Sequence, residues 1–468
     1  MKKVELVFVP SPGVGHLAST LKAANLLLGR HERISITVFV IKLSSDLKIA
    51  KYIDSLPTSD RIRFIHLRPN DDSNDSPLTF IEKYKPHIKE AVSKLTANSD
   101  SSLAGFVLDM FCAPVIDVAN EFGVPSYIFY TSSAASLGFW LYVQFIHDEQ
   151  HVDLTQFKDS NTELVVPTSV NSVPGRVFPS SFFEKERLVP LLAHGRRFRE
   201  SKGIMVNSFM ELESHAFNYF GHSESSKTPP VYPVGPILGL EGDVVSDGSI
   251  GDKEIMKWLD DQAPESVVFL CFGSGGGFPE DQVKEIACAL EHTGYRFLWS
   301  LRQLPPKGKM GPPSDYEDLA QVLPTGFLDR TDGIGKIIGW APQTAILGHP
   351  AIGGFVSHCG WNSILESLWF GVPIATWPMY AEQQFNAFAM VIELGLAVEI
   401  KMDYKKDSEI IVSAKDIEKG IKCLMEHDNE VRMKVKEMSE NSRKALSDGG
   451  SSSFSLDRLI QDIINNVI

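Results

Sequence analysis

The sequence is poor in the features that mark several large classes of protein. Its 468 residues include only five cysteines, an odd and widely spaced set without a Cys-x-x-Cys pair, which argues against a disulfide framework and against a zinc site. Basic residues are in the minority, with 45 Lys and Arg against 59 Asp and Glu. The net charge of −14 repels a polyanion on average, so nucleic acid is not expected as a partner.

Long apolar runs are also missing. The first residues resemble a signal peptide only in their charge, because Glu5 interrupts the apolar run and Pro10 ends it, so residues 4–9 are predicted to form a strand. The most apolar later stretch, residues 127–146, contains several hydroxyl side chains and Gln144, which makes it a poor membrane span. We therefore expect a cytoplasmic protein that acts as a monomer without stable membrane insertion.

What the sequence has is a regular alternation of apolar strands and helical stretches. Hydrophobic residues make up 43% and charged residues 22%, a globular composition, and the length predicts two domains. The alternation runs through the first half, stops in a Pro-rich and then Gly/Asp/Ser-rich region between residues 221 and 253, and restarts from residue 267. This rhythm predicts an α/β fold with two doubly wound, Rossmann-like domains facing across a cleft.

The expected domain limits follow from that break. Residues 1–240 should form the first domain, which would bind the acceptor of any transfer reaction, 241–253 a linker, and 254–450 the second domain. Residues 451–468 carry an amphipathic pattern and are predicted to form a helix that packs back on the first domain.

The stretch from Trp340 to Gln383 carries the strongest functional signal. Gly360-Trp361-Asn362-Ser363 has the form of a strand-to-helix turn, whose free backbone N–H groups can meet an anion at the positive end of the helix dipole. His358 adds a side-chain donor, and Glu366 lies one turn further on, where a carboxylate can accept both hydroxyls of a ribose. Trp340 offers a flat face for a base. Each feature alone is usually structural, but together they indicate a nucleotide site.

This stretch of 44 residues resembles, almost from end to end, the signature box of plant family 1 glycosyltransferases. The resemblance implies the GT-B fold and a UDP-sugar donor, with no other cofactor. It also implies roles for single residues: Trp340 stacking on uracil, Ala341 holding it through the backbone, Gln343 in the donor site, Glu366 on the ribose, His358, Asn362 and Ser363 on the diphosphate, and Trp361, Glu382 and Gln383 on the sugar. The final Gln383 favours glucose, whereas Glu382 replaces an aspartate that is common in the family.

A glycine-rich loop, residues 272–277, follows the first strand of the second domain. Its glycines let the backbone approach a phosphate, and Ser274 is predicted to donate to it. The loop lacks the Gly-Lys-Ser/Thr of a nucleotide-hydrolysing P-loop. No Asp-x-Asp triplet, which other transferases use to hold a metal under the diphosphate, occurs in the chain, so a metal-independent enzyme is expected.

His16 and Asp109 are the candidate catalytic pair. Transfer to an alcohol requires removal of the acceptor proton, and histidine titrates in the right range. His16 lies in the loop Pro10-Ser11-Pro12-Gly13-Val14-Gly15-His16 after one strand, and Asp109 ends another strand, where it could orient the imidazole. Either residue could instead be an ordinary helix-start residue. The family resemblance matches both to its catalytic dyad and places the Thr131 hydroxyl against the sugar.

The predicted reaction is an inverting transfer of glucose from UDP-glucose to a hydroxyl of a small lipophilic plant metabolite, phenolic (for example a flavonoid) or terpenoid. Two alternatives are an NAD(P)-dependent dehydrogenase, although neither glycine-rich turn fits Gly-x-Gly-x-x-Gly well, and a UDP-sugar-binding protein without activity. The acceptor pocket is expected from apolar and aromatic segments at 79–87, 139–145, 178–183 and 379–380. Candidate acceptor-binding residues are Phe139 and Tyr380 from these segments and Gly15 from the loop that carries His16.

Overall fold

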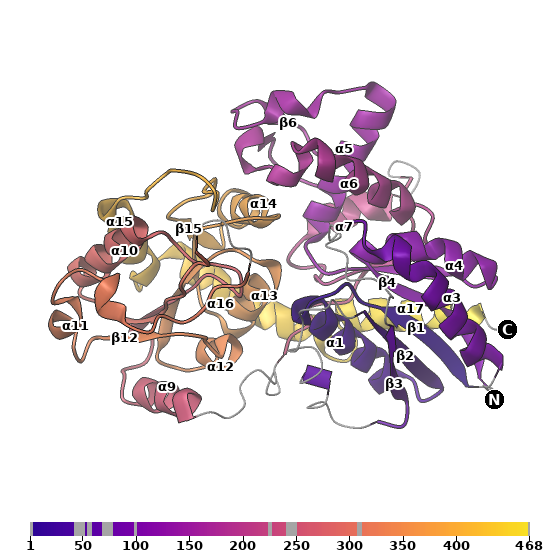
Figure 1. The fold of residues 1–468 in the computed structure, drawn as a ribbon, viewed down its shortest axis with the longest axis horizontal. Helices are drawn as coiled ribbons and strands as arrows, with labels where there is room; N and C mark the ends of the chain where they lie inside the picture. The colour runs from indigo at the N-terminus through magenta and orange to yellow at the C-terminus, as the bar shows by residue number, and fades with distance from the viewer. Residues whose placement is uncertain are drawn as a thin grey trace.

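The computed structural model describes residues 3–41, 52–53, 59–67, 78–97, 101–222, 227–239, 250–306 and 311–466. These residues form two parallel sheets, each covered by helices and lying side by side along the molecule (Figure 1). The α/β architecture with two doubly wound sheets is the one that the sequence predicts. Of the predicted linker, residues 241–249 lie outside the described residues, and the last four belong to helix α9.

The first sheet has seven strands in the described part of the chain, all parallel, in the order β3-β2-β1-β4-β5-β8-β9. The strands are β1 (Val4–Val9), β2 (Ile34–Ile41), β3 (Ile62–Leu67), β4 (Ser102–Asp109), β5 (Ser126–Tyr130), β8 (Gly203–Val206) and β9 (Val231–Pro233). The helices are α1 (Val14–Arg30), α3 (Ile81–Ala97), α4 (Ile116–Glu121), α5 (Ala134–Gln150), α6 (Lys185–Phe198) and α7 (Ser214–Gly221). The first domain also contains four short 3₁₀ turns among the described residues: η1 (Met110–Val115), η2 (Leu154–Phe157), η3 (Gly175–Val177) and η4 (Ser180–Phe182). Two strands of two residues each, β6 (Glu163–Leu164) and β7 (Val173–Pro174), form a separate antiparallel pair.

The second sheet repeats the plan with six parallel strands among the described residues, in the order β12-β11-β10-β13-β14-β15. The strands are β10 (Val267–Cys271), β11 (Arg296–Ser300), β12 (Gly335–Ile338), β13 (Ile352–Ser357), β14 (Ile374–Thr376) and β15 (Ala397–Glu399). The helices are α9 (Ile250–Asp260), α10 (Glu280–Thr293), α11 (Phe327–Arg330), α12 (Gln343–Leu347), α13 (Trp361–Phe370), α14 (Gln383–Phe388) with a π-helical turn η6 (Ala389–Glu393), α15 (Ala414–Met425), α16 (Glu430–Leu446) and α17 (Ser451–Asn465), besides the turn η5 (Leu319–Gln321).

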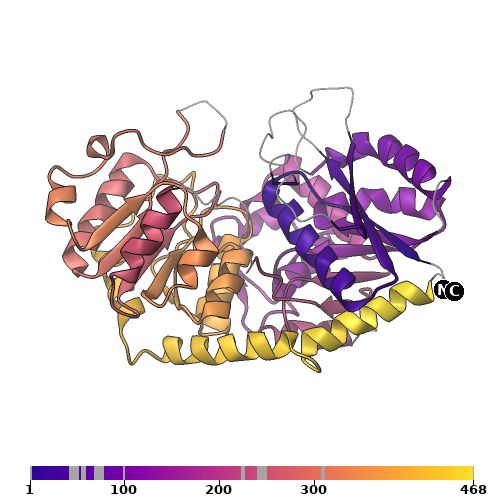
Figure 2. The ribbon, with the colours of Figure 1, turned by 90° about the horizontal axis from the view of Figure 1, so that it is seen from below.

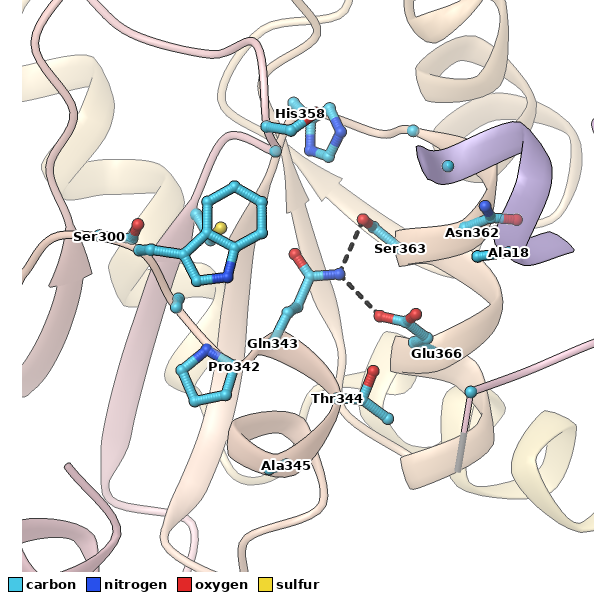
Figure 3. Close-up of a pocket in the computed structure, with 18 of the residues that line it drawn as sticks. Ala18, Ser300, Pro342, Gln343, Thr344, Ala345, His358, Asn362, Ser363 and Glu366 are labelled. Atoms are coloured by element: carbon cyan, nitrogen blue, oxygen red, sulfur yellow. Dashed lines mark hydrogen bonds between the residues drawn. The ribbon is translucent and has the colours of Figure 1, made fainter. Parts of the chain in front are cut away.

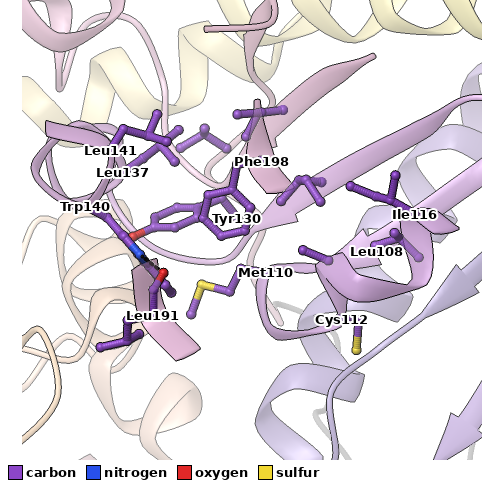
Figure 4. Packing of buried hydrophobic residues seen from close by; sticks show 14 of the residues in the cluster. Leu108, Met110, Cys112, Ile116, Tyr130, Leu137, Trp140, Leu141, Leu191 and Phe198 are labelled. Atoms are coloured by element: carbon purple, nitrogen blue, oxygen red, sulfur yellow. Dashed lines mark hydrogen bonds between the residues drawn. The ribbon is translucent and has the colours of Figure 1, made fainter. Parts of the chain in front are cut away.

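Burial on both faces explains why most residues of the inner strand β1 are apolar. Leu6 and Phe8 of β1 belong to the core under α1 and α17, whereas Val7 and Val9 belong to the core on the opposite face. On that face, Trp140 and Leu137 of α5 pack with Phe198 and Leu191 of α6 around Tyr130 (Figure 4). The Trp140 indole N–H is also paired, because it donates to the backbone oxygen of Leu191 at 2.7 Å.

The last two helices join the domains. Helix α16 packs in the core of the second domain through Val435, and α17 then runs along the underside of the first domain (Figure 2). Leu459 and Ile463 of α17 are fully buried there. The hydroxyl of Ser452 donates to the Gly235 backbone oxygen at 2.6 Å, which fixes the start of the helix. The chain therefore ends on the domain in which it begins.

Two parts of the fold differ from the expectation. The Pro-rich region between residues 221 and 253 contains strand β9, because an edge strand tolerates prolines that an inner strand does not. After β4, where the alternation of strands and helical stretches predicts a helix, the chain first forms the 3₁₀ turn η1, which contains Pro114, and becomes α-helical only from Ile116. No helix in the described ranges is long and apolar enough to cross a membrane.

We predict that the contact of α17 with the first sheet contributes substantially to stability. Leu459→Ala removes a side chain that is fully buried, so the free energy of unfolding should fall by about 2–5 kcal/mol in a urea titration. Phe454→Ala is the matched control, because Phe454 lies on the same helix with 62% of its surface exposed, and it should change the free energy by less than about 0.5 kcal/mol. Equal effects of the two changes would contradict the packing described.

Candidate active site

His16 and Asp109 meet at the carboxyl edge of the first sheet. Their strands β1 and β4 are neighbours at the point where the strand order reverses, which is where doubly wound sheets bind ligands. The Nδ1 atom of His16 lies 2.8 Å from Oδ2 of Asp109. Helix α1 begins at Val14, so His16 belongs to its first turn, after Gly13 at φ +109°, a conformation that favours glycine.

The Asp109 carboxylate is buried and has further donors. The Ser11 hydroxyl and, at 3.1 Å, the Phe111 backbone N–H donate to Oδ1. Burial alone would raise the pKa of Asp109, but His16, Ser11 and the Phe111 N–H outweigh it, and the pKa is lowered. Burial also opposes the charged form of His16, yet the attraction of Asp109 is larger, so the pKa of His16 lies above its usual value. The carboxylate thus stays ionised and fixes the imidazole so that Nε2 is the nitrogen left for proton transfer.

A cavity of about 560 Å³ lies between the two sheets and collects most of the predicted nucleotide-binding residues. Gln343, at the start of α12, donates through Nε2 to the Ser363 hydroxyl at 2.8 Å and to the Glu366 carboxylate at 2.7 Å (Figure 3). Gly15 and Ala18 of α1 border the same cavity, so the helix that carries His16 forms part of its wall. The predicted lining residues are Gly15, Ser274, Trp340, Ala341, Gln343, His358, Trp361, Asn362, Ser363 and Glu366.

The His358 imidazole is wedged between two glycines. A Cβ atom at Gly273 or at Gly360 would lie 2.6 Å from Nε2 of His358, so neither position accepts a larger residue without displacement of the ring. Burial outweighs a hydrogen bond to the Cys271 backbone and lowers the pKa of His358 to about 4. The ring is therefore neutral at physiological pH, and it can offer a hydrogen bond but no positive charge.

Two signature-box residues also bind the first domain. The Trp361 indole N–H donates to the Asn207 backbone oxygen at 2.7 Å, so this predicted sugar contact is a buried link between the domains that also lines the cavity. The Asn362 amide donates to the Ser19 hydroxyl of α1 at 3.3 Å, and its oxygen accepts from the Asn207 side chain at 3.4 Å. The mouth of the cavity is thereby held by both halves of the chain.

Of the residues predicted for the sugar, Trp361 lines the cavity, whereas Glu382 lies at a second junction between the domains. Glu382 accepts a hydrogen bond at 3.2 Å from Ser132, the neighbour of Thr131 at the end of β5. Glu382 lies near enough to His16 to favour its charged form. The Gln383 side-chain oxygen accepts from the backbone N–H groups of Met379 and Tyr380 at 2.9 and 3.1 Å, which leaves its NH₂ group as the part suited to a sugar hydroxyl.

The candidate acceptor residues lie in different environments. Phe139 is an interior residue, 2% exposed, packed against Phe178, Phe182 and Phe385, so it supports a wall rather than presenting a surface. Tyr380 is 36% exposed, and its hydroxyl lies against Gly275 of the glycine-rich loop.

The Phe111 ring lies beside the candidate catalytic pair, with its centroid 5.7 Å from that of His16 and 6.1 Å from that of Trp140. The sequence analysis did not single out Phe111, although it follows Asp109 by two residues.

Comparisons with known proteins show which family the chain resembles. The family model described as UDP-glucoronosyl and UDP-glucosyl transferase matches residues 236–440. Anthocyanidin 3-O-glucosyltransferase 6 of Manihot esculenta is 68% identical over 85% of this chain and 100% of its own length. A transferase from Siraitia grosvenorii in complex with UDP has a TM-score of 0.92 at 51% identity over 99% of this chain and 100% of its own. Medicago truncatula UGT71G1 complexed with UDP-glucose has a TM-score of 0.88 at 43% identity over 98% of each chain.

The chain belongs to the plant family 1 glycosyltransferases and has the GT-B fold. It is an enzyme of the UDP-glycosyltransferase class. The expectation of a UDP-glucose-dependent glucosyltransferase that acts on small plant metabolites is confirmed at this level, and the dehydrogenase alternative is wrong.

Gln343 should be important for nucleotide affinity, because it orders both Ser363 and Glu366. Gln343→Ala removes two hydrogen bonds, one of them to a carboxylate, and should weaken UDP binding by about tenfold in isothermal titration calorimetry. Gln321→Ala is the control, because Gln321 is exposed and its side chain donates to the nearby Asp318. The UDP affinity of this variant should equal that of the unmodified enzyme. An unchanged affinity of the Gln343 variant would show that Ser363 and Glu366 need no such support.

Proposed function

We propose that this enzyme transfers glucose from UDP-glucose to a hydroxyl group of a flavonoid-type phenol, with His16 as general base and Asp109 as its partner. The observation that carries the proposal is the 2.8 Å hydrogen bond between these two side chains. His16 lies on α1, the helix that borders the nucleotide cavity. The acceptor class is supported by relatives named as anthocyanidin or flavonoid 3-O-glucosyltransferases, at 68%, 58% and 55% identity.

In the proposed reaction, Nε2 of His16 takes the proton from the acceptor hydroxyl as its oxygen attacks the anomeric carbon of glucose. Asp109 accepts a hydrogen bond from the Nδ1–H group and, remaining ionised, stabilises the imidazolium that forms. The bond from the anomeric carbon to the UDP oxygen breaks, and its electron pair leaves with UDP. Attack from the face opposite UDP inverts the carbon, so an α-linked donor gives a β-glucoside.

The charge that develops on UDP would be met by dipoles and hydrogen bonds. We assign this role to Ser274, Ser363, Asn362 and the N-terminus of α13, with His358 as a neutral donor. Glu366, held by Gln343, is placed to accept the ribose hydroxyls, while Ala341 would hold the uracil stacked on Trp340. Thr131, Glu382 and Gln383 would bind the glucose hydroxyls, since they follow β5 and β14 on the two sides of the junction.

Removal of the imidazole should abolish most activity. In a coupled assay with UDP-glucose and quercetin as a test acceptor, His16→Ala should lower kcat by about 10²- to 10⁴-fold, because the acceptor hydroxyl loses its base. UDP affinity should stay within about twofold, since His16 donates no bond to the nucleotide in this scheme. Turnover near that of the unmodified enzyme would refute the assignment of the base.

The acidic limb of the pH profile should report the His16–Asp109 pair. Because the base must be neutral and the pKa of His16 is raised, kcat/KM should increase with pH through a pKa above the usual 6.5 of histidine. Asp109→Asn removes the charge that raises this pKa while burial still lowers it, so the limb should move to lower pH, with a rate loss on the order of 100-fold. A limb that stays in place would assign the titration to another group.

A further inference from the structure

We infer that Arg302 is a positioning residue that holds the Trp340 indole as a flat platform for the uracil ring of the donor. The inference rests on the proposed stacking role of Trp340 and adds a residue that the signature box does not contain. Arg302 follows β11 by two residues, and among the described residues that line the nucleotide cavity it is the one Lys or Arg.

The guanidinium lies over the indole. The Cζ atom of Arg302 is 5.4 Å from the Trp340 ring centroid, within the range of a cation–π interaction. Trp340 itself is 39% exposed, so packing alone surrounds it incompletely. The Arg302 side chain, in contrast, is only 13% exposed and therefore well fixed.

Three groups of one neighbouring segment fix Arg302. Its Nε lies 3.0 Å from Oδ1 of Asp315, its second terminal nitrogen donates to the Pro313 backbone oxygen at 2.6 Å, and Nε reaches the Ser314 backbone oxygen at 3.4 Å. Ser314 and Gln303 are paired by two backbone hydrogen bonds of 2.7 and 3.0 Å. The position of the guanidinium is thus fixed by residues 313–315, and this segment is itself paired with the residue that follows Arg302.

The same segment touches the residue before Trp340. A Cβ atom at Gly339 would lie 2.4 Å from the Asp315 carboxylate, so the carboxylate covers this glycine directly. Arg302, Asp315 and Trp340 consequently form one unit at the base-binding end of the cavity. A preformed platform lowers the cost of ordering the side chain on binding, which for one flexible side chain corresponds to about twofold to tenfold in affinity.

Arg302 has two possible roles that ligand binding can tell apart, support of Trp340 and direct contact with the diphosphate. If the guanidinium acts through Trp340, its loss should weaken ligands that carry uracil and leave inorganic diphosphate unaffected. If it meets the diphosphate instead, both ligands should weaken together. UDP and inorganic diphosphate therefore distinguish the two roles on the same protein.

The experiment is a double-mutant cycle on the full chain, with dissociation constants for UDP and for inorganic diphosphate measured by calorimetry in the presence of EDTA. Arg302→Met should weaken UDP binding by about twofold to tenfold and raise the KM for UDP-glucose with kcat nearly unchanged. In a Trp340→Ala background the same change should have no further effect on UDP. Arg296→Met is the control, because Arg296 lies on β11, the strand that precedes Arg302, and donates to the Gln262 side-chain oxygen at 2.6 Å. This change should affect the binding of neither ligand.

A loss of diphosphate affinity equal to that of UDP, or an effect of Arg302→Met that is fully retained without Trp340, would overturn the inference. If Trp340→Ala itself leaves UDP binding unchanged, the stacking role in the proposed function fails as well. If Trp340→Ala weakens UDP binding but Arg302→Met does not act through it, only the inference about Arg302 fails, so the two failures are distinguishable. Arg302→Lys keeps a cation but not the planar fork, and it replaces the methionine variant in the cycle if that variant does not fold.

Discussion

The active site depends on one constraint, that the carboxyl edges of two parallel sheets face the same cavity. Parallel strands bring every loop that follows a strand to one edge, so residues far apart in sequence converge there. Hydrogen bonds join the two edges at the cavity, among them the buried bond from the Trp361 indole to the Asn207 backbone and the bond from the Asn362 amide to Ser19. Phe385 and Phe388 of α14 extend this contact by packing in the core of the first domain. Donor and acceptor sides are aligned by the same packing that stabilises the fold.

Two histidines at this junction have opposite protonation behaviour because their partners differ. Both rings lose water, which disfavours the imidazolium. His16 has an ionised carboxylate at 2.8 Å, and the attraction reverses the effect of burial. His358 has only backbone and glycine around it, so burial decides and the pKa falls to about 4. His16 can therefore take up a proton more readily than a free imidazole, whereas His358 stays neutral at physiological pH.

Sequence patterns predicted the inner strands of the sheets better than the edge strands. Inner strands such as β1 and β10 are apolar on both faces and short, and their bounds match the predicted residues. The edge strand β9 has prolines around and within it, so its pattern is that of a loop and pairing with β8 alone makes it a strand. In the site, the structure brings His16 next to Asp109 and gathers several residues of the signature box around one cavity, while their individual roles stay predictions. Arg302, Asn207 and Ser132 have no motif, because their roles arise from contacts between segments that sequence spacing does not relate.

The return of α17 to the first sheet has a consequence for evolution and engineering. The hydrophobic surface beneath β1 and β5 is completed by side chains of α17, such as Leu459 and Ile460. The first domain is thus discontinuous along the polypeptide, because its core includes residues that lie beyond the whole second domain in the sequence. Chimeras that exchange acceptor specificity between relatives must carry the terminal helix along with the amino-terminal segment, or the two will meet as mismatched surfaces.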